Sequence, residues 1–424
     1  MTIEPSIGMS RNWEPLSAGS SAAEHCLETL KSTPKVLLLF STIHYAENNG
    51  LTKLIDGVYS KFSKDIPLVG GTVSGFMTPE GSFTRGVVLL TLSGEGFDVS
   101  ISVGSDTKRN PSKAVDNAFS NFPKNRRSQR FILSIISGGA VPQFFGWTPK
   151  KTIKSKFVGE VFSKFIDMFL LLLQKGVGRE DEILRLLCSK LTTEKLLSIS
   201  TEDNNEMITN FQFLNSEITT NKLICVIIDS DQICHVNTES SLSKTNTRFT
   251  VTELSANKRL IKKINGKPAK SEFLRLMNWS EGYIDEKIYR RAFHYPLASE
   301  VDGQLIPFIG GLFWGENIYA TYQLLNNEVC LLTTSGRDIV QAYRKTIGEP
   351  RGLSFVLAAE CGIRLEAIGS KVNLEQEVLS EVTQGKKFLC LFVAGEATYS
   401  KETGLRYGNW TVNTATVFSE QGTI

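Results

Sequence analysis

Two groups of charged residues near the end of the sequence have the chemistry of a ligand site. Glu360, Cys361 and Arg364 follow one apolar run of strand length, and Gly395 and Glu396 close another. An arginine donates two hydrogen bonds to a carboxylate and a glutamate accepts from an ammonium group, so these residues suit a zwitterion such as an amino acid. The same charges would suit a structural ion pair between two strands, and the sequence leaves both interpretations open. Cys361 is expected to stay a neutral thiol, because its setting is apolar and no histidine lies near it in the sequence.

A glycine-rich stretch near the start of the sequence offers backbone and hydroxyl groups in place of charges. Gly71 and Gly75 flank Thr72 and Ser74 at the expected end of a strand. Glycine lets backbone N–H groups approach a ligand closely, and the hydroxyls donate or accept hydrogen bonds. A tight turn or β-bulge would need the same glycines for its own geometry. The four residues are therefore candidate ligand-binding residues with a structural alternative.

The four histidines raise the alternative of a haem-based sensor of a gas such as nitric oxide. His294, beside Tyr295-Pro296, is the first choice of axial ligand, and His25, His44 and His235 follow. A lone histidine next to a proline turn is more often an ordinary surface or core residue. We therefore expect no cofactor and no metal site, with haem at His294 as the alternative.

Enzyme signatures are missing from the sequence. The segment Gly71–Gly75 lacks the serine in the middle of five positions that a nucleophile elbow requires. The sequence also holds no phosphate-binding P-loop, dinucleotide fingerprint or zinc-protease helix. We predict from this that the chain has no catalytic residues and is not an enzyme.

The elements that would position these residues follow a repeated order. Lys35–Phe40 is an unbroken apolar run typical of a buried strand, and the apolar residues of 51–62 recur at helical spacing. Strands are expected next at Ile66–Val73 and Arg85–Ser93. Later rounds are expected as strand 130–136, helices 157–174 and 181–198, strands 210–214 and 223–229, and then as strand 353–359, helix 373–382 and strands 388–395 and 409–418. The sequence thus predicts an α+β fold of mixed sheets flanked by helices, with strand-helix-strand-strand units repeated along the chain.

Length and composition set the organisation of the molecule. A chain of 424 residues exceeds the usual size of one hydrophobic core, so two domains are expected. The polar stretch Ser230–Asn246 is the candidate linker, which gives domains 30–238 and 239–424. The net charge of +3 is too small to draw the whole molecule to nucleic acid. No apolar run is long enough for membrane insertion, and seven scattered cysteines suit reduced thiols in the cytoplasm.

Several segments in this order resemble the FIST family, in which an N-terminal and a C-terminal FIST domain occur as a pair. The resemblance extends from about Lys35 to about Phe418. It is carried by 69–75, 130–139 and 211–217, then by 249–253, 264–269 and 294–297, and finally by 359–364, 393–396 and 413–414.

The resemblance implies a cytoplasmic small-molecule-binding sensor in signal transduction. Ligands proposed for such proteins include amino acids, and some members bind haem. This chain carries no recognisable output module, so it would signal through a separate protein such as a kinase, cyclase or chemotaxis component. A partner-docking scaffold with no ligand is the further alternative.

Overall fold

The computed structural model describes residues 3–124, 126–141, 150–173, 178–232, 234–301, 303–348 and 352–418. The chain is 28% helix and 41% strand, arranged as several mixed sheets with helices on their outer faces. This confirms the predicted α+β fold class. Within the described residues, no helix is long and apolar enough to cross a membrane.

Three stretches of the chain share one order of elements, which we call repeats 1, 2 and 3 (residues 3–94, 97–230 and 234–418). Each contains a strand, a helix, a strand, a helix, a strand, a two-stranded hairpin and a closing strand. In repeat 1 these are β1 (Ile3–Ser10), α1 (Pro15–Thr29), β2 (Val36–Thr42), the 3-10 helix η1 (Ile43–Asn49), α2 (Gly50–Tyr59), β3 (Leu68–Val73), β4 (Gly75–Thr78), β5 (Gly81–Phe83) and β6 (Val87–Gly94).

Repeats 2 and 3 follow the same order with insertions. Repeat 2 has β7 (Phe97–Ser105), α3 (Pro111–Ser120), β8 (Gln129–Ile136), the inserted β9 (Thr152–Ile153) and α4 (Lys156–Leu173), α5 (Glu180–Cys188), β10 (Lys195–Ser200), β11 (Gln212–Leu214), β12 (Glu217–Thr219) and β13 (Lys222–Ser230). Repeat 3 has β14 (Cys234–Ser240), α8 (Gly336–Ile347), β23 (Leu353–Cys361), α9 (Gly362–Ile368), η3 (Gly369–Lys371), α10 (Val372–Val382), β24 (Lys387–Val393), β25 (Glu396–Ser400), β26 (Gly404–Gly408) and β27 (Thr411–Phe418).

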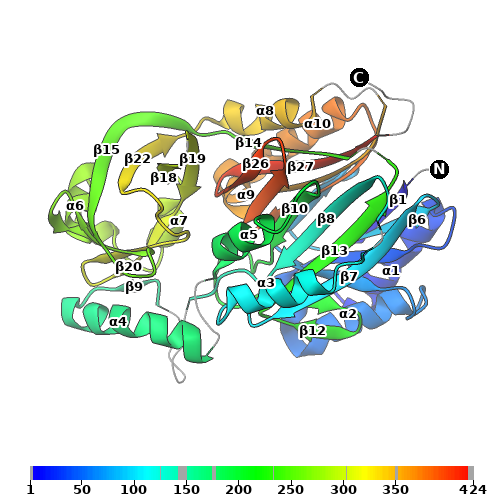
Figure 1. The fold of residues 1–424 in the computed structure, drawn as a ribbon, viewed down its shortest axis with the longest axis horizontal. Coiled ribbons are helices and arrows are strands. Elements are labelled where there is room, and N and C mark those ends of the chain that lie inside the picture. The colour runs from blue at the N-terminus through cyan, green and yellow to red at the C-terminus, as the bar shows by residue number, and fades with distance from the viewer. Residues whose placement is uncertain are drawn as a thin grey trace.

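A long insertion in repeat 3 forms a separate lobe, residues 243–333, seen at the left of Figure 1. Its sheet has the order β19-β18-β22-β15-β16-β21-β20-β9, so β9 of repeat 2 pairs at its end. The lobe consists of β15 (Ser243–Leu254), β16 (Leu260–Ile264), β17 (Lys267–Pro268), α6 (Ala269–Met277), η2 (Glu281–Tyr283), α7 (Ile288–Ala292), β18 (Leu297–Val301), β19 (Gln304–Phe308), β20 (Gly310–Trp314), β21 (Asn317–Ala320) and β22 (Glu328–Thr333).

Each repeat gives its hairpin to the sheet of another repeat. The three sheets have the orders β1-β6-β2-β3-β11-β12, β26-β25-β10-β8-β13-β7 and β14-β27-β23-β24-β4-β5. Repeat 1 therefore extends the sheet of repeat 3, repeat 3 extends that of repeat 2, and repeat 2 extends that of repeat 1. The parallel pairs β2/β3, β8/β10 and β23/β24 occupy equivalent places in the three sheets.

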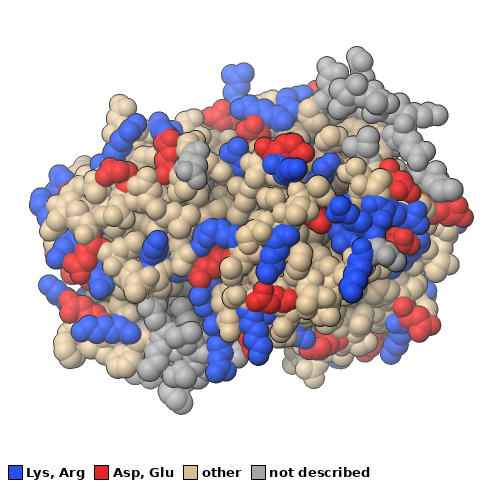
Figure 2. Space-filling view, viewed as in Figure 1, with Lys and Arg blue, Asp and Glu red and all other residues tan. Residues whose placement is uncertain are grey.

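The three sheets enclose one apolar core. Leu38, Leu133 and Leu357 lie on strands of different sheets and belong to the same cluster of buried side chains. Leu37 and Leu39 alternate with Leu38 and pack on the other face of β2, among residues of α1 and α2. This burial on both faces explains the unbroken apolar sequence of β2. Charged side chains of both signs are interspersed on the molecular surface (Figure 2).

Two predicted elements are wrong. The helix expected over 181–198 ends at Cys188, and Lys195–Ser200 is instead β10, because Leu196, Leu197 and Ile199 are needed in the core between β8 and β25. The expected linker Ser230–Asn246 contains β14, which pairs with β27 along its whole length. The domain boundary near residue 238 stays a prediction, and the hairpins β4–β5 and β25–β26 cross it.

Candidate functional site

A buried cavity lies where the C-terminal ends of β10 and β24 meet the lobe, and we call it the junction cavity. Its volume available to water-sized molecules is about 50 Å³, enough for a few waters or a very small ligand. Figure 1 shows α5, α7 and α9 close to this junction. The lining residues are Gly139, Gly178, Glu180, Thr201, Glu202, Asp203, Asn205, Met207, Tyr289, Thr321, Tyr322, Ile363, Ala394, Gly395 and Asn409.

Glu202 is the acidic residue of the cavity with the greatest capacity left for a ligand. Its N–H donates to the Thr72 carbonyl at 2.8 Å, which fixes the residue just beyond the end of β10. Its carboxylate fits over Gly362, where a Cβ atom would lie 2.4 Å from Glu202 Oε2. Glu202 is 4% exposed, and Oε2 has no partner in normal hydrogen-bond geometry, although the Ser74 hydroxyl, itself without a partner, lies close enough to lower the pKa of this carboxyl. Burial, with smaller contributions from the charges of Asp203 and Glu366, raises the pKa of Glu202 to about 8.

Asp203 holds the loop that carries Glu202. Its carboxylate accepts hydrogen bonds from the N–H groups of Met207, Ile208 and Thr209 at 2.8, 2.5 and 2.7 Å. Asn205 ties the same loop to repeat 3, because its side-chain amide donates to the Gly362 carbonyl at 3.2 Å. With three donors already bound, Asp203 positions the wall of the cavity and has little capacity left for a ligand.

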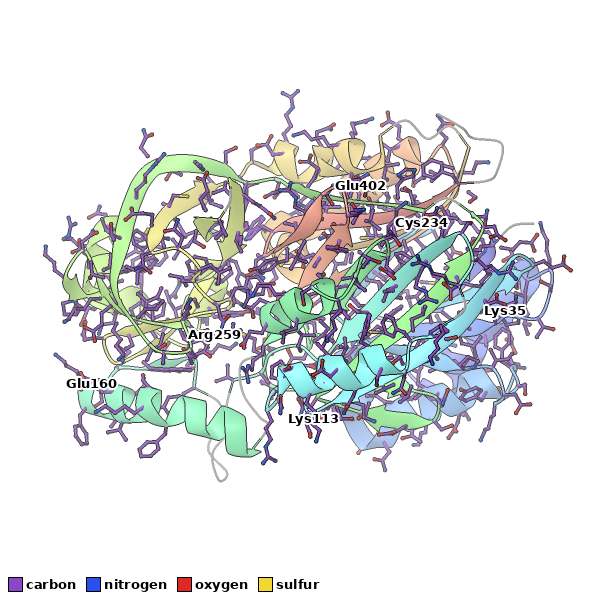
Figure 3. All side chains as sticks on the ribbon, viewed as in Figure 1. Lys35, Lys113, Glu160, Cys234, Arg259 and Glu402 are labelled. Carbon is purple, nitrogen blue, oxygen red and sulfur yellow. The ribbon has the colours of Figure 1, made fainter. Side chains whose placement is uncertain are left out.

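Glu180 lies at the start of α5 and faces the cavity beside the contact between α5 and the lobe. Burial raises the pKa of Glu180, whereas the positive charges of Arg259 and Lys108 lower it. The next residue, Asp181, forms an almost fully buried ion pair with Arg259 of the lobe. Figure 3 labels Arg259 between the lobe and α5. This ion pair fixes the position of Glu180 relative to the lobe.

The lobe contributes the opposite wall through Thr321 and Tyr322. The Thr321 carbonyl accepts from Arg259 at 2.7 Å, and its hydroxyl donates to Asn409 Oδ1 at 2.9 Å. Tyr322 approaches Gly395 closely, since a Cβ there would be 3.1 Å from the Tyr322 hydroxyl oxygen. Burial raises the pKa of Tyr322 well above its usual value, and the charge of Glu396 adds to this. The wall is therefore neutral and polar.

Residues predicted near the end of β24 lie at or next to the cavity. Gly395 lines it, and Asn409 of the lining donates weakly to Cys361 Sγ at 3.9 Å. Glu396 Oε1 accepts from the backbone and hydroxyl of Thr411, but Oε2 has no partner. Burial raises the pKa of Glu396 well above its usual value, and burial likewise keeps Cys361 a neutral thiol.

The predicted glycine-rich stretch supports the cavity from behind. The Thr72 carbonyl accepts a hydrogen bond from the Glu202 N–H. A Cβ atom on residue 71 would lie 2.5 Å from the Thr201 side chain, so glycine at this position leaves space for that side chain. Ser74 donates its N–H to the Phe392 carbonyl at 2.9 Å, and Gly75 pairs with Phe392 at the start of β4. The structure thus brings this stretch against repeats 2 and 3, although none of its residues lines the cavity.

Glu360 and Arg364 form a structural ion pair, which was one of the two interpretations of their sequence. Arg364 donates to Glu360 at 2.7 Å and to Glu375 at 2.6 Å, and all three side chains are fully buried. Arg364 also donates to the Ile339 carbonyl and to Ser241 Oγ. Every direction of the guanidinium is occupied by protein. The expected zwitterion cradle is therefore wrong for Arg364 and Glu360.

None of the four histidines lines the junction cavity, and haem at His294 stays a prediction. His294 is exposed and lines none of the described cavities, His25 bonds the Met9 carbonyl through Nδ1, and His44 bonds the Thr42 hydroxyl. Burial lowers the pKa of His44 to about 4. Among the residues described, no cluster of three His, Cys, Asp or Glu side chains suits a metal ion.

The sequence prediction missed Glu180, Glu202, Asp203 and both cavity tyrosines. Glu202 had a signal: it follows β10 as Glu396 follows β24, each at the end of a buried parallel strand. The leucine-rich sequence of 181–198, which predicts a helix, hides that signal because it includes most of β10. Tyr289 and Tyr322 belong to the lobe. No local sequence pattern indicates that the lobe packs against repeats 2 and 3.

Comparison with known proteins gives a family match over more than half of the chain. Residues 35–267 match the model of the FIST N domain, which covers most of repeat 1, all of repeat 2 and the start of repeat 3. No curated protein matches the chain.

Solved structures with similar folds include two cyanuric acid hydrolases. One covers 99% of this chain and 100% of its own at 8% identity and a TM-score of 0.34, and the other, from A. caulinodans, has the same coverage at 7% identity and a TM-score of 0.30. PurLQS from Thermotoga maritima covers 98% of this chain and 72% of its own at 9% identity and a TM-score of 0.21. The prediction that the chain is not an enzyme is corrected, because structures matched over nearly the whole chain are hydrolases. Scores this low give no argument for any particular reaction.

Proposed function

This chain belongs to the FIST family of signal-transduction sensor domains, and we propose that its input is a small molecule with a protonated amine, held in the junction cavity. The observation that carries the proposal is Glu202, a carboxylate that is 4% exposed, lines the cavity and has one oxygen without a hydrogen-bond partner. A buried polar atom without a partner is costly, and a ligand donor that reaches it removes that cost.

The charge of the lining favours an amine over a complete amino acid. The described lining holds Glu180, Glu202 and Asp203, and it contains no lysine, arginine or histidine. A ligand carboxylate would therefore meet three acidic side chains and no cation in the described lining, and Arg364 is engaged with Glu360 and Glu375. An ammonium group, by contrast, donates up to three hydrogen bonds to such acceptors. The proposed ligand is therefore recognised by its amino group, and a carboxylate such as that of an amino acid is not expected to contribute to binding.

Binding of the amine is coupled to release of a proton. With a pKa of about 8, Glu202 is mostly protonated at neutral pH in the free protein. A cation beside it favours the ionised form, so the proton leaves as the amine binds. Affinity for a protonated amine should consequently rise with pH up to about pH 8.

The lobe is the element that would transmit the binding event. Thr321 and Tyr322 of the lobe line the cavity opposite Glu202, and the Arg259–Asp181 pair connects the lobe with α5. A ligand that contacts both sides favours one position of the lobe through its differential affinity. A separate signalling protein would then recognise that position.

Four small molecules of similar size but different charge test the proposal by thermal shift. Ethanolamine, a cation, should raise the melting temperature. Glycolate, an anion, and ethylene glycol, a neutral diol, should not. Glycine, a zwitterion, should give a smaller shift than ethanolamine. A ligand at about 100 times its Kd adds about 2.7 kcal/mol, so the shift is measurable. Stabilisation by glycolate or glycine in excess of ethanolamine would show that the amine proposal is wrong.

A further inference from the structure

Helix α4 is mounted rigidly on the outside of the lobe. Gly159 and Gly315 allow a close approach, since a Cβ on Gly159 would lie 2.1 Å from the Gly315 nitrogen. Phe162 packs edge-on against Trp314 with ring centroids 4.8 Å apart, and Ser163 accepts from the Asn317 side chain at 3.3 Å. One side of the helix is therefore fixed to β20 and β21.

The side of α4 that faces away from the lobe exposes large apolar residues. Phe157 is 77% exposed, Val158 49% and Val161 39%. Their spacing places them on one side of a helix, away from Gly159 and Ser163, which are buried against the lobe. Neighbouring apolar residues exposed in this way indicate an interaction surface.

Lysines surround this apolar surface. Lys150, Lys154, Lys156 and Lys164 are exposed, and the only carboxylate at an exposed position of residues 150–165 is Glu160, labelled in Figure 3. None of the four lysines forms an ion pair with another described residue, so their charges are available to an external anion.

A groove that is lined by further lysines runs beside the helix. Its volume is about 510 Å³, and α4 contributes Lys156, Glu160 and Lys164 to it. The facing strand β16 contributes Lys262 and Lys263, which share their charge with Glu253. Figure 2 shows charged side chains of both signs, with lysines and arginines next to uncharged surface, at the lower left, where α4 lies. The groove and the apolar side of α4 are adjacent along the same helix.

We propose that α4 docks the protein on an anionic lipid surface. Phe157, Val158 and Val161 would enter the interface between headgroups and acyl chains, and the surrounding lysines would contact the lipid phosphates and carboxylates. An apolar helix face bordered by lysines is the arrangement that binds membrane interfaces without crossing them. Four exposed lysines against one exposed glutamate within residues 150–165 give a surplus of positive charge, which favours lipid over an ordinary protein surface of mixed charge. The site is separate from the junction cavity and does not depend on its ligand.

Vesicle co-sedimentation of the full chain tests this. Vesicles of phosphatidylcholine mixed with phosphatidylserine should bind the protein at least about tenfold better than phosphatidylcholine alone, and added salt should reduce the difference. Phe157→Ser/Val161→Ser and Lys156→Glu/Lys164→Glu should each lose most of the binding. Leu374→Ser on α10 and Lys113→Glu on α3, which change equally exposed residues elsewhere, should retain it.

Three outcomes would overturn the proposal. The first is no binding to either vesicle, and the second is binding that is equal for both vesicles or unchanged in the α4 variants. The third is self-association of the wild-type chain in solution that the Phe157→Ser/Val161→Ser variant abolishes, without vesicle binding, since a second copy would then occupy the surface. All of the variants change exposed residues, so unfolding does not confuse the result.

Discussion

A protonated carboxyl buried at Glu202 makes the stability of the protein depend on pH. The unfolded chain ionises this residue near 4.5, whereas the folded chain keeps its proton up to about pH 8. The folded state binds the proton of Glu202 more tightly than the unfolded state, and this stabilises the fold. The stabilisation is complete below pH 4.5 and is lost as the pH rises to 8. Glu202 therefore costs stability at alkaline pH.

The Glu202→Gln variant should remove this dependence. At pH 5 the two proteins should have similar stability, because a neutral amide replaces a neutral acid. At pH 8.5 the variant should be more stable by roughly 2–4 kcal/mol. Chemical denaturation across this pH range measures the difference. A difference that stays constant with pH would show that Glu202 does not hold a proton.

Arg364 should be essential for stability. Replacing it with alanine leaves Glu360 and Glu375 buried without their cation, and burial already raises the pKa of both. Loss of one partner from such a group costs about 3–5 kcal/mol. The control is Arg344→Ala, which removes an exposed, solvent-screened pair with Glu381 and should change the stability little. Equal effects of the two variants in urea denaturation would contradict the structural role of Arg364.

At the residue scale the sequence predicted the position of the site better than its chemistry. Glycine and charge patterns at strand ends identified Gly395 and its surroundings, because strand ends collect at one edge of a sheet. They could not show that Arg364 is surrounded by Glu360, Glu375 and backbone, since Glu375 lies on a different helix. Which charges are paired is a property of tertiary packing.

Among the elements, the contact between α5 and the lobe decides how far the cavity walls can move. Asp181 accepts hydrogen bonds from Arg259, Arg185 and the Gln323 N–H. Glu180 of the cavity is adjacent to Asp181, and Tyr322 is adjacent to Gln323. Loosening this contact should loosen both walls together.

Asp181→Asn tests the connection. The amide cannot balance the charge of the buried Arg259, so amide hydrogens of 320–324 should exchange at least about tenfold faster, whereas those of α1 should be unchanged. Ethanolamine should protect the same amides in the wild type. Asp285→Asn, which weakens a more exposed pair with Arg291 in the lobe, is the control. Unaltered exchange at 320–324 would show that the ion pair does not hold the wall.

At the element scale, sequence periodicity succeeded for strands buried on both faces and failed where helix and strand share a composition. The runs at β2, β8 and β24 are long enough to be unmistakable. Lys195–Ser200 continues a leucine-rich helical sequence, and only its pairing with β8 and β25 makes it a strand. The lobe was not predicted as a unit, because the pairings that join its hairpins into one sheet, β15 with β22 and β16 with β21, connect strands far apart in the sequence.

For the whole molecule, the exchange of hairpins makes the three repeats depend on each other. Without residues 239–424, β10 loses its neighbour β25, and without residues 1–238, β24 loses its neighbour β4. The core shared by the three sheets would also be open to water. Repetition of units was predicted from the sequence. The exchange of hairpins could not be predicted, because it consists of the pairs β3/β11, β10/β25 and β4/β24, whose strands lie far apart in the sequence.

Separate expression of the two predicted domains tests this dependence. Neither 1–238 nor 239–424 should show a cooperative thermal transition by circular dichroism, because each lacks a strand in at least one sheet and part of the core. Mixing the fragments should restore a transition. A cooperative transition of 1–238 alone would show that the domains fold independently.

The most direct test of the proposed function is calorimetric titration of ethanolamine into the wild type and Glu202→Gln at pH 6 and pH 8. Binding to the wild type should be saturable, at least about tenfold tighter at pH 8, and accompanied by release of a proton. The variant should lose both the pH dependence and most of the affinity. Binding that is equally tight at both pH values, or equal in the two proteins, would contradict the claim that a buried carboxyl of the junction cavity recognises an amine. Absence of binding to a wild-type protein that is fully folded would contradict it as well.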